Sequence, residues 1–340
     1  MANPQINEGA SATTKPSAPT SATDHGVSWL SKLIGVQGPL IGLVVLCIFF
    51  SFSTSGAFLS IRNALNVLDQ VTVLGILSIG MTAVIISGGI DLSVGSVLAF
   101  AMMVMGWLSH DCGSPLLLAI PLGIIVGAAC GLTNGLLVTR AKLPPFIATL
   151  SMMTIARGLA NIITDGRQIV GYPDWFDSLA TVRYLSFFSI TVVLFIVLVI
   201  LSWLHLGYRA VGRSLYAIGG SPEVARLAGI RVRRLITWVY VGSGILSAVA
   251  GVELASRLDS SQPSAGLGYE LDAIAAVVIG GASLSGGVGG IAGTVVGVFI
   301  IGVLHNGLNL TGVSPFIQQV IIGVVIALAV SSDTLRRRGA

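Results

Sequence analysis

The sequence has very little charge. Only 9% of its 340 residues are Asp, Glu, Lys or Arg, against about 25% in an average soluble domain, and 54% are hydrophobic. So few charges cannot cover the surface of a water-soluble globule, and the mean hydropathy of +0.92 agrees. The composition therefore argues against a soluble enzyme, a disordered chain and a nucleic-acid binder.

Cysteine and the common catalytic motifs are also scarce. Three cysteines do not form a disulfide framework, and the sequence contains no CxxC, GxSxG or HExxH. The four histidines are scattered, so each is interpreted as structural or interfacial. We predict no catalytic residue and no metal site in this chain.

A P-loop is missing as well. Walker A requires Gly-Lys followed by Ser or Thr, and none of the three lysines follows a glycine. The stretch 287–292 formally fits GxGxxA, but no βαβ pattern precedes it, so a dinucleotide site is rejected. If the chain takes part in active transport, the energy must come from an ion gradient or from another chain.

Long apolar runs dominate what is present. A bilayer core about 30 Å thick needs roughly 20 apolar residues per helix. Candidate spans lie at 39–58, 67–87, 91–110, 116–138, 146–163, 186–206, 234–256, 271–287, 290–310 and 314–332. We expect an all-α polytopic membrane protein with about ten transmembrane helices, of which the glycine-rich runs 91–110 and 271–287 could be partly re-entrant.

The basic residues are distributed unevenly between the loops. With the N-terminus in the cytoplasm, thirteen of the eighteen Lys and Arg residues fall inside, four fall outside, and Arg157 lies within a span. Cytoplasmic loops carry the excess of positive charge, so both termini are expected to be cytoplasmic. The expected divisions are a disordered tail over 1–35, a transmembrane domain over 36–333 and a basic tail over 334–340.

Glycines recur at helical spacing. Gly123, Gly127, Gly131 and Gly135 are four residues apart, as are Gly289, Gly293 and Gly297. Such spacing lets two helix backbones approach closely in a membrane. The pattern GGxxLSxG occurs twice, at 88–95 and at 280–287, which suggests the internal repeat common in transporters.

Few ionisable residues lie in or near the spans. They are Asp69, Asp91, Arg157, Glu253 and Asp272, mostly toward span ends, where an interfacial position is expected. This set is thin for an ion-coupled carrier. The longest outside loop, 164–185, carries aromatic and acidic residues that fit either a membrane-interface belt or a docking surface for an external protein.

One cytoplasmic loop, within 213–231, predicts a short helix. Ser221 can cap it, Pro222 suits its first position, Glu223 its first turn and Gly229 its end. A helix of about seven residues neither spans a membrane nor persists alone in water, so it needs a surface to dock on. That surface is either the bilayer or a cytoplasmic partner. The expected coupling residues are Ser221, Pro222, Glu223, Arg226, Leu227 and Gly229.

Four stretches together resemble the permease subunits of ABC importers for monosaccharides, the ribose type. They are 80–82 with 88–96 (GGIDLSVGS), 145–150 (PFIATL), 219–230, and 262–281 (ending GYELDAIAAVVIGG) with 306–310 (NGLNL). The resemblance covers about residues 40–332. Its motif residues here are Gly88, Gly89, Asp91, Ser93, Gly95, Glu270 and Asp272.

The resemblance implies a set of partners in the bacterial inner membrane. A second permease chain, identical or a sister, would complete the pathway, and a cytoplasmic ATPase would bind ATP and Mg and receive the short helix. A periplasmic or lipid-anchored sugar-binding protein would deliver the substrate. This chain would itself hold no cofactor and would switch its opening by alternating access.

The sequence does not identify the transported molecule. A sugar presents hydroxyls, which pair with amides and hydroxyls. Candidate path residues are therefore Asn134, Thr149, Ser151, Asn306, Asn309 and Gln318. Helix–helix hydrogen bonding is the competing interpretation for each. A ribose-like pentose, a hexose and a polyol all fit, and the alternatives are a stand-alone carrier or channel and an importer of branched-chain amino acids.

Overall fold

The computed structural model describes residues 28–184 and 188–338, with side chains over 38–184 and 188–328 and at Ser331. Residues 1–27 of the expected tail lie outside this part. The first helix begins at Ser28, inside the range expected for the tail, and the last continues to Arg338, inside the range expected for the basic tail. Arginine has high helix propensity, so nothing in that sequence ends the helix earlier.

Nearly every described element is a helix. The order is α1 (Ser28–Ser53), α2 (Ile61–Ile86), α3 (Val94–His110), α4 (Leu116–Thr139), α5 (Pro145–Thr164), β1 (Ile169–Val170), α6 (Asp174–Thr181), α7 (Ile190–Tyr208), α8 (Ala210–Gly220), α9 (Pro222–Leu227), α10 (Val232–Leu258), β2 (Ser260–Ser261), α11 (Tyr269–Ile279), α12 (Ile291–Leu310) and α13 (Pro315–Arg338). The two-residue strands pair antiparallel. The all-α expectation is confirmed.

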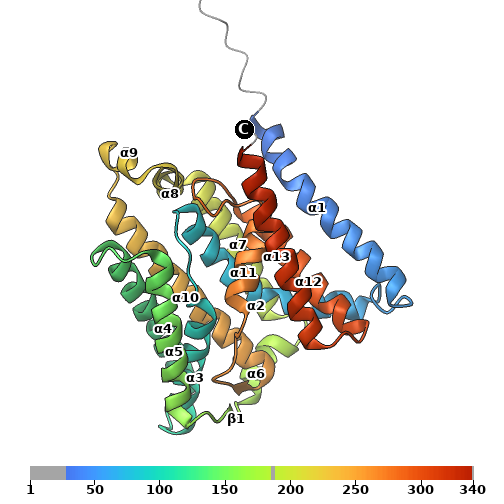
Figure 1. The fold of residues 1–340 in the computed structure, drawn as a ribbon. Coiled ribbons are helices and arrows are strands. Elements are labelled where there is room, and N and C mark those ends of the chain that lie inside the picture. Colours follow the sequence, from blue (N-terminus) through green and yellow to red (C-terminus); the bar gives the residue numbers. More distant parts are fainter. Residues whose placement is uncertain (1–27, 185–187, 339–340) are drawn as a thin grey trace, which may run out of the picture.

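Most of the predicted spans coincide with helices. Six of the described helices are long and apolar enough to cross a membrane: α2, α4, α5, α7, α10 and α12. The apolar parts of α1, α3 and α13 are shorter, at Gly38–Ser53, Val94–His110 and Pro315–Leu328. Figure 1 shows the start of α1 and the end of α13 at the same end of the bundle as α8 and α9, with β1 and α6 at the opposite end.

The predicted span 271–287 is not a helix over its length. Its helix, α11, stops at Ile279, and eleven residues rise only about 16 Å, roughly half a bilayer core. The following segment contains Gly281, Gly286 and Gly287 at φ +92°, +85° and +74°. Only glycine adopts these angles without strain, so the backbone leaves the helix here. Residues 87–93, before α3, are likewise non-helical.

The glycine spacing produces close helix packing as predicted. A Cβ on Gly127 of α4 would lie 2.6 Å from Ala248 Cβ of α10, and one on Gly135 would lie 2.8 Å from Thr237 Cα. No side chain fits at these distances. Van der Waals contact between bare backbones therefore joins α4 to α10. Gly293 and Gly297 of α12 pack in the same way against α11.

Candidate functional site

The short helix α9 forms where the sequence predicts it. Ser221 Oγ accepts a hydrogen bond from the Val224 N–H at 3.3 Å, and Pro222 occupies the first helical position. At the other end Gly229 takes φ +83°, and the Ile230 N–H donates to the Ala225 carbonyl at 3.0 Å. Both ends of α9 are therefore capped within the loop itself.

The outer face of α9 is apolar and uncovered. Val224 is 64% exposed and Leu227 is 86% exposed, whereas Ala225 is buried against the rest of the chain. Glu223 and Arg226 are exposed beside them. Figure 1 shows α9 projecting from the end of the bundle. An apolar tip framed by charges is the shape of a docking contact, and an exposed leucine in water is unfavourable without one.

The preceding helix, α8, seats α9 on the membrane helices. Leu215 and Ile218 are buried, and Tyr216 Oη donates to the Gly289 carbonyl at 2.9 Å. Burial raises the pKa of the Tyr216 hydroxyl, which keeps its proton available for this bond. Gly219 contacts the backbone of Ile86 and Gly287 so closely that a Cβ there would overlap both.

The first GGxxLSxG segment closes around a buried carboxylate. Asp91 is 2% exposed and accepts hydrogen bonds from Ser93 Oγ at 2.6 Å and from Ser243 Oγ of α10 at 2.8 Å. Asn134 Nδ2 of α4 donates to Ser93 Oγ at 2.9 Å. This polar cluster encloses the Asp91 carboxylate within the bundle, whereas its depth in the membrane stays a prediction.

Two predicted path residues serve this same segment. Asn134 is buried in the cluster, and Thr149 Oγ1 of α5 donates to the Ile90 carbonyl at 3.1 Å. Both side chains therefore contact the non-helical segment 87–93, and a role for them in lining the substrate path stays a prediction. Ser151, two residues further along α5, is exposed and donates to the Ile147 carbonyl of its own helix at 2.9 Å.

The other predicted path residues gather around α12. Asn306 and Asn63 of α2 exchange two amide hydrogen bonds at 2.9 and 3.0 Å. Gln318 Nε2 of α13 donates to Asn309 Oδ1 at 2.8 Å. Asn306 and Gln318 are buried, whereas Asn309 is exposed. Sequence reasoning missed Asn63, whose partner lies 243 positions away.

The GYELDAIAAVVIGG stretch at 268–281 also brings charged side chains against neighbouring helices. Asp272 Oδ2 of α11 lies 3.2 Å from His305 Nε2 of α12. Glu270 lies against α3, because a Cβ on Gly95 would be 2.6 Å from its Oε2. Arg157 of α5 donates to the carbonyls of Pro263 and Ala265, the latter at 2.8 Å. The sequence signal for these two hydrogen bonds was a lone arginine in an apolar span.

Several charged groups near the β1 and α6 end have polar partners. Asp69 of α2 accepts from Arg183, and Arg257 of α10 donates to the Asp69 carbonyl at 3.0 Å. Glu253 accepts from Thr72 and is 3% exposed, so it is buried within the bundle, and its depth in the membrane stays a prediction. Among the described residues, no three His, Cys, Asp or Glu side chains are grouped to hold a metal ion.

Comparison with known proteins gives consistent similarities. A family described as "Branched-chain amino acid transport system / permease component" matches residues 63–330. The ribose import permease protein of Bacillus subtilis (strain 168) is 47% identical over 297 residues, covering 87% of this chain and 92% of that protein. No solved structure gives a significant match.

Relatives with other named sugars are also similar. The fructose import permease protein of Rhizobium meliloti is 38% identical, covering 88% of this chain and 85% of that protein. The xylose transport system permease protein of Escherichia coli (strain K12) is 35% identical, covering 95% of this chain and 97% of that protein.

Proposed function

The chain belongs to this family of ABC importer permeases and is a multi-pass protein of the bacterial inner membrane, and we propose that it carries a monosaccharide inward for a separate ATPase. The observation that carries the proposal is α9, a capped helix whose apolar tip, Val224 and Leu227, is 64% and 86% exposed in the described chain. ATP and Mg bind the partner, since no Walker A occurs here.

The cytoplasmic side is the α9 end of the bundle. The loop 209–231 that carries α8 and α9 holds four arginines and the first turn of α10 holds two more, and an excess of basic residues supports a cytoplasmic location. The start of α1 at Ser28 and the end of α13 at Arg338 lie at that same end (Figure 1). With the half-length α11 and its non-helical continuation counted as one crossing, the chain crosses ten times.

Movement of α9 reaches the membrane helices through α8. Helix α8 contacts Ile86, the last residue of α2 directly before the non-helical segment 87–93, and it contacts Gly287 and Gly289 of the non-helical segment 280–290 after α11. When the ATPase moves α9, α8 shifts both segments together. Alternating access needs such an element with two arrangements, biased by a ligand on the partner.

The cargo is a ribose-like pentose, a hexose or a related polyol. Support comes from three relatives named for ribose, fructose and xylose. The family description names branched-chain amino acids instead, and this is the second candidate. A zwitterion calls for free charges along the path. Asp69 and Asp272 are engaged by Arg183 and His305, whereas Asp91, Glu253 and Glu270 form no salt bridge within the described residues, so the support for a sugar rests on the relatives.

Two further partners complete the importer. A second permease chain forms the other half of the pathway, and an external sugar-binding protein docks at the end that carries β1 and α6. There Trp175 is 43% exposed, beside the exposed Asp174 and the half-buried Asp177.

Competition for uptake tests the cargo. Cells expressing the chain with its ATPase and binding protein are given labelled ribose, with unlabelled xylose, fructose, inositol or leucine as competitors. We expect competition by at least one sugar or polyol and none by leucine. Competition by leucine alone would contradict the sugar proposal and leave the ABC assignment standing.

A further inference from the structure

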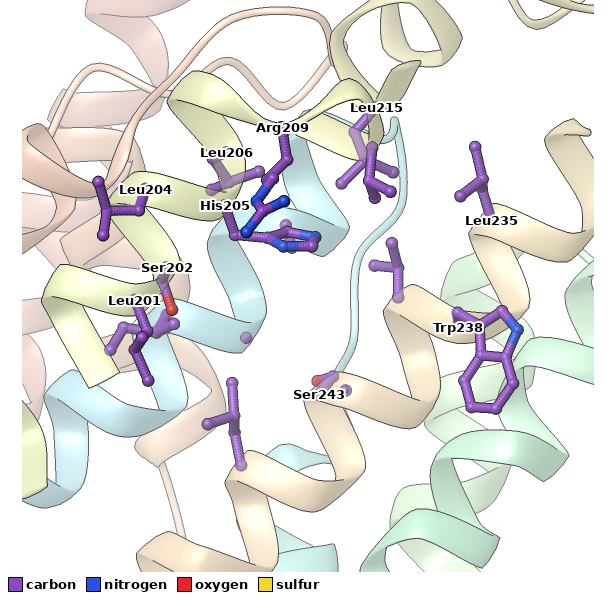
Figure 2. A pocket seen from close by; sticks show the side chains of 17 residues that line it. Leu201, Ser202, Leu204, His205, Leu206, Arg209, Leu215, Leu235, Trp238 and Ser243 are labelled. Carbon is purple, nitrogen blue, oxygen red and sulfur yellow. The ribbon is translucent and has the colours of Figure 1, made fainter. Parts of the chain in front are cut away.

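A cavity of about 510 Å³ opens between α2, α7, α8 and α10 (Figure 2). Most of its wall is aliphatic or aromatic, including Leu201, Leu204, Leu235, Trp238 and Leu246. Leu201, Leu204 and Trp238 are 56%, 42% and 64% exposed. These residues belong to membrane-spanning helices, so the cavity opens sideways toward lipid.

One end of the cavity is basic. His205 and Arg209 are four residues apart at the end of α7, and Figure 2 shows both on the cavity wall, with Leu235 and Trp238 of α10 across from them. No acidic residue lines the cavity, and Arg209 forms no ion pair within the described residues. Because α7 ends at Tyr208, Arg209 lies where the span meets the cytoplasmic headgroups.

We propose that this cavity binds one anionic phospholipid, with an acyl chain along the leucine wall and the phosphate on Arg209 and His205. The apolar wall excludes a free phosphate ion as occupant, since most of the site would contact it unfavourably. A lipid satisfies both parts of the cavity, and basic residues at the inner boundary attract anionic headgroups. The inference requires only that the chain is in a membrane and does not depend on its cargo.

The bound lipid would set the distance between α8 and α10. Leu215 of α8 and Ser243 of α10 line opposite parts of the cavity, and Ser243 holds Asp91 of the first non-helical segment. An acyl chain between α7 and α10 therefore contacts α8. It also contacts Ser243, which bonds Asp91 of the non-helical segment 87–93.

Lipid retention on the assembled importer tests the proposal. The complex is exchanged into nanodiscs of phosphatidylethanolamine with phosphatidylglycerol, then released, and co-purifying lipid is counted by native mass spectrometry. We expect Arg209→Gln to weaken phosphatidylglycerol retention about fivefold, the effect of one interfacial cation. Arg213→Gln is the matched control, because Arg213 lies outside the cavity and its guanidinium donates to the Tyr208 carbonyl at 3.2 Å.

A second pair of variants tests the acyl-chain part. Gly242 lines the cavity, and a Cβ there would meet nothing within 4 Å, so Gly242→Leu fills the space without a backbone clash. It should release the lipid while the complex elutes unchanged. Gly207→Leu, on an equally open glycine of α7 outside the cavity, should not. Equal retention by Arg209→Gln and Arg213→Gln, or full retention by Gly242→Leu, would overturn the proposal.

Discussion

The backbone N–H of Gly287 donates to the carbonyl oxygen of Ile86 at 2.9 Å. This bond joins the segment after α11 to the end of α2, where the other non-helical segment begins. The Gly219 carbonyl lies 2.9 Å from the position of a Cβ on Gly286, and Gly88 Cα lies 3.0 Å from it. The two GGxxLSxG segments therefore meet each other and α8 at one junction of bare backbone.

A methyl group at this junction should impair coupling. Gly219→Ala places a Cβ against backbone atoms of Ile86 and Gly287, which cannot yield as a flexible side chain would. Overpacking of this kind costs about 1–3 kcal/mol, so ATP-dependent uptake should fall roughly tenfold or more. The measurement is uptake of labelled sugar with the amount of assembled complex held equal.

The neighbouring glycine supplies the control. A Cβ on Gly220 would meet nothing within 4 Å, so Gly220→Ala adds the same methyl group to α8 without a clash. Uptake by this variant should match the wild type. Equal uptake by the two variants would show that the junction does not transmit the movement.

The tip of α9 should determine affinity for the ATPase. Burying one leucine side chain contributes about 1.5–3 kcal/mol, so Leu227→Ser should raise the Kd for the ATPase roughly tenfold or more. Ala228→Ser changes the next, smaller exposed residue and should have little effect. Surface-immobilised complex in nanodiscs and soluble ATPase give both dissociation constants, and an unchanged Kd for Leu227→Ser would exclude this face as the contact.

Removal of the α9 cap should loosen the helix locally. Ser221→Ala leaves the Val224 N–H without its side-chain acceptor, a loss of about 1 kcal/mol. Amide exchange at 224–227 should accelerate about fivefold, and Ser221→Asp should restore protection because aspartate also caps. Exchange that is unaffected by Ser221→Ala would mean that α9 is held by other contacts.

The reciprocal pair of Asn63 and Asn306 should stabilise the bundle as a unit. Asn63→Ala leaves the buried Asn306 amide without this partner, and Asn306→Ala leaves Asn63 Oδ1 unpaired while its Nδ2 keeps the Phe58 carbonyl, so each change should cost about 1–3 kcal/mol. The double variant removes both amides, so its loss should be smaller than the sum of the single losses. Thermal unfolding of the purified complex measures all three, and simple additivity would contradict a direct bond.

The sequence anticipates features that depend on local pattern. The apolar runs, the Gly123–Gly135 spacing and the caps of α9 each follow from residues close together in the chain. Long-range pairs could not be predicted in this way. The position of Asp91 near a span end predicts an interfacial residue. The cost of burying its carboxylate is reduced by a hydrogen bond from Ser243, which lies 152 positions along the chain and could not be foreseen. Likewise, the sequence alone could not show that Asn134 bonds Ser93 or that Thr149 lies within hydrogen-bond distance of the Ile90 carbonyl.

ATP-dependent accumulation in proteoliposomes tests the central claim most directly. The chain is reconstituted with its ATPase, the sugar-binding protein is supplied on the outside with labelled ribose, and ATP is enclosed on the α9 side. We expect ribose to accumulate only with ATP and to stop with Leu227→Ser. Accumulation that proceeds without any ATPase, or at full rate with Leu227→Ser, would contradict a permease that is driven through α9.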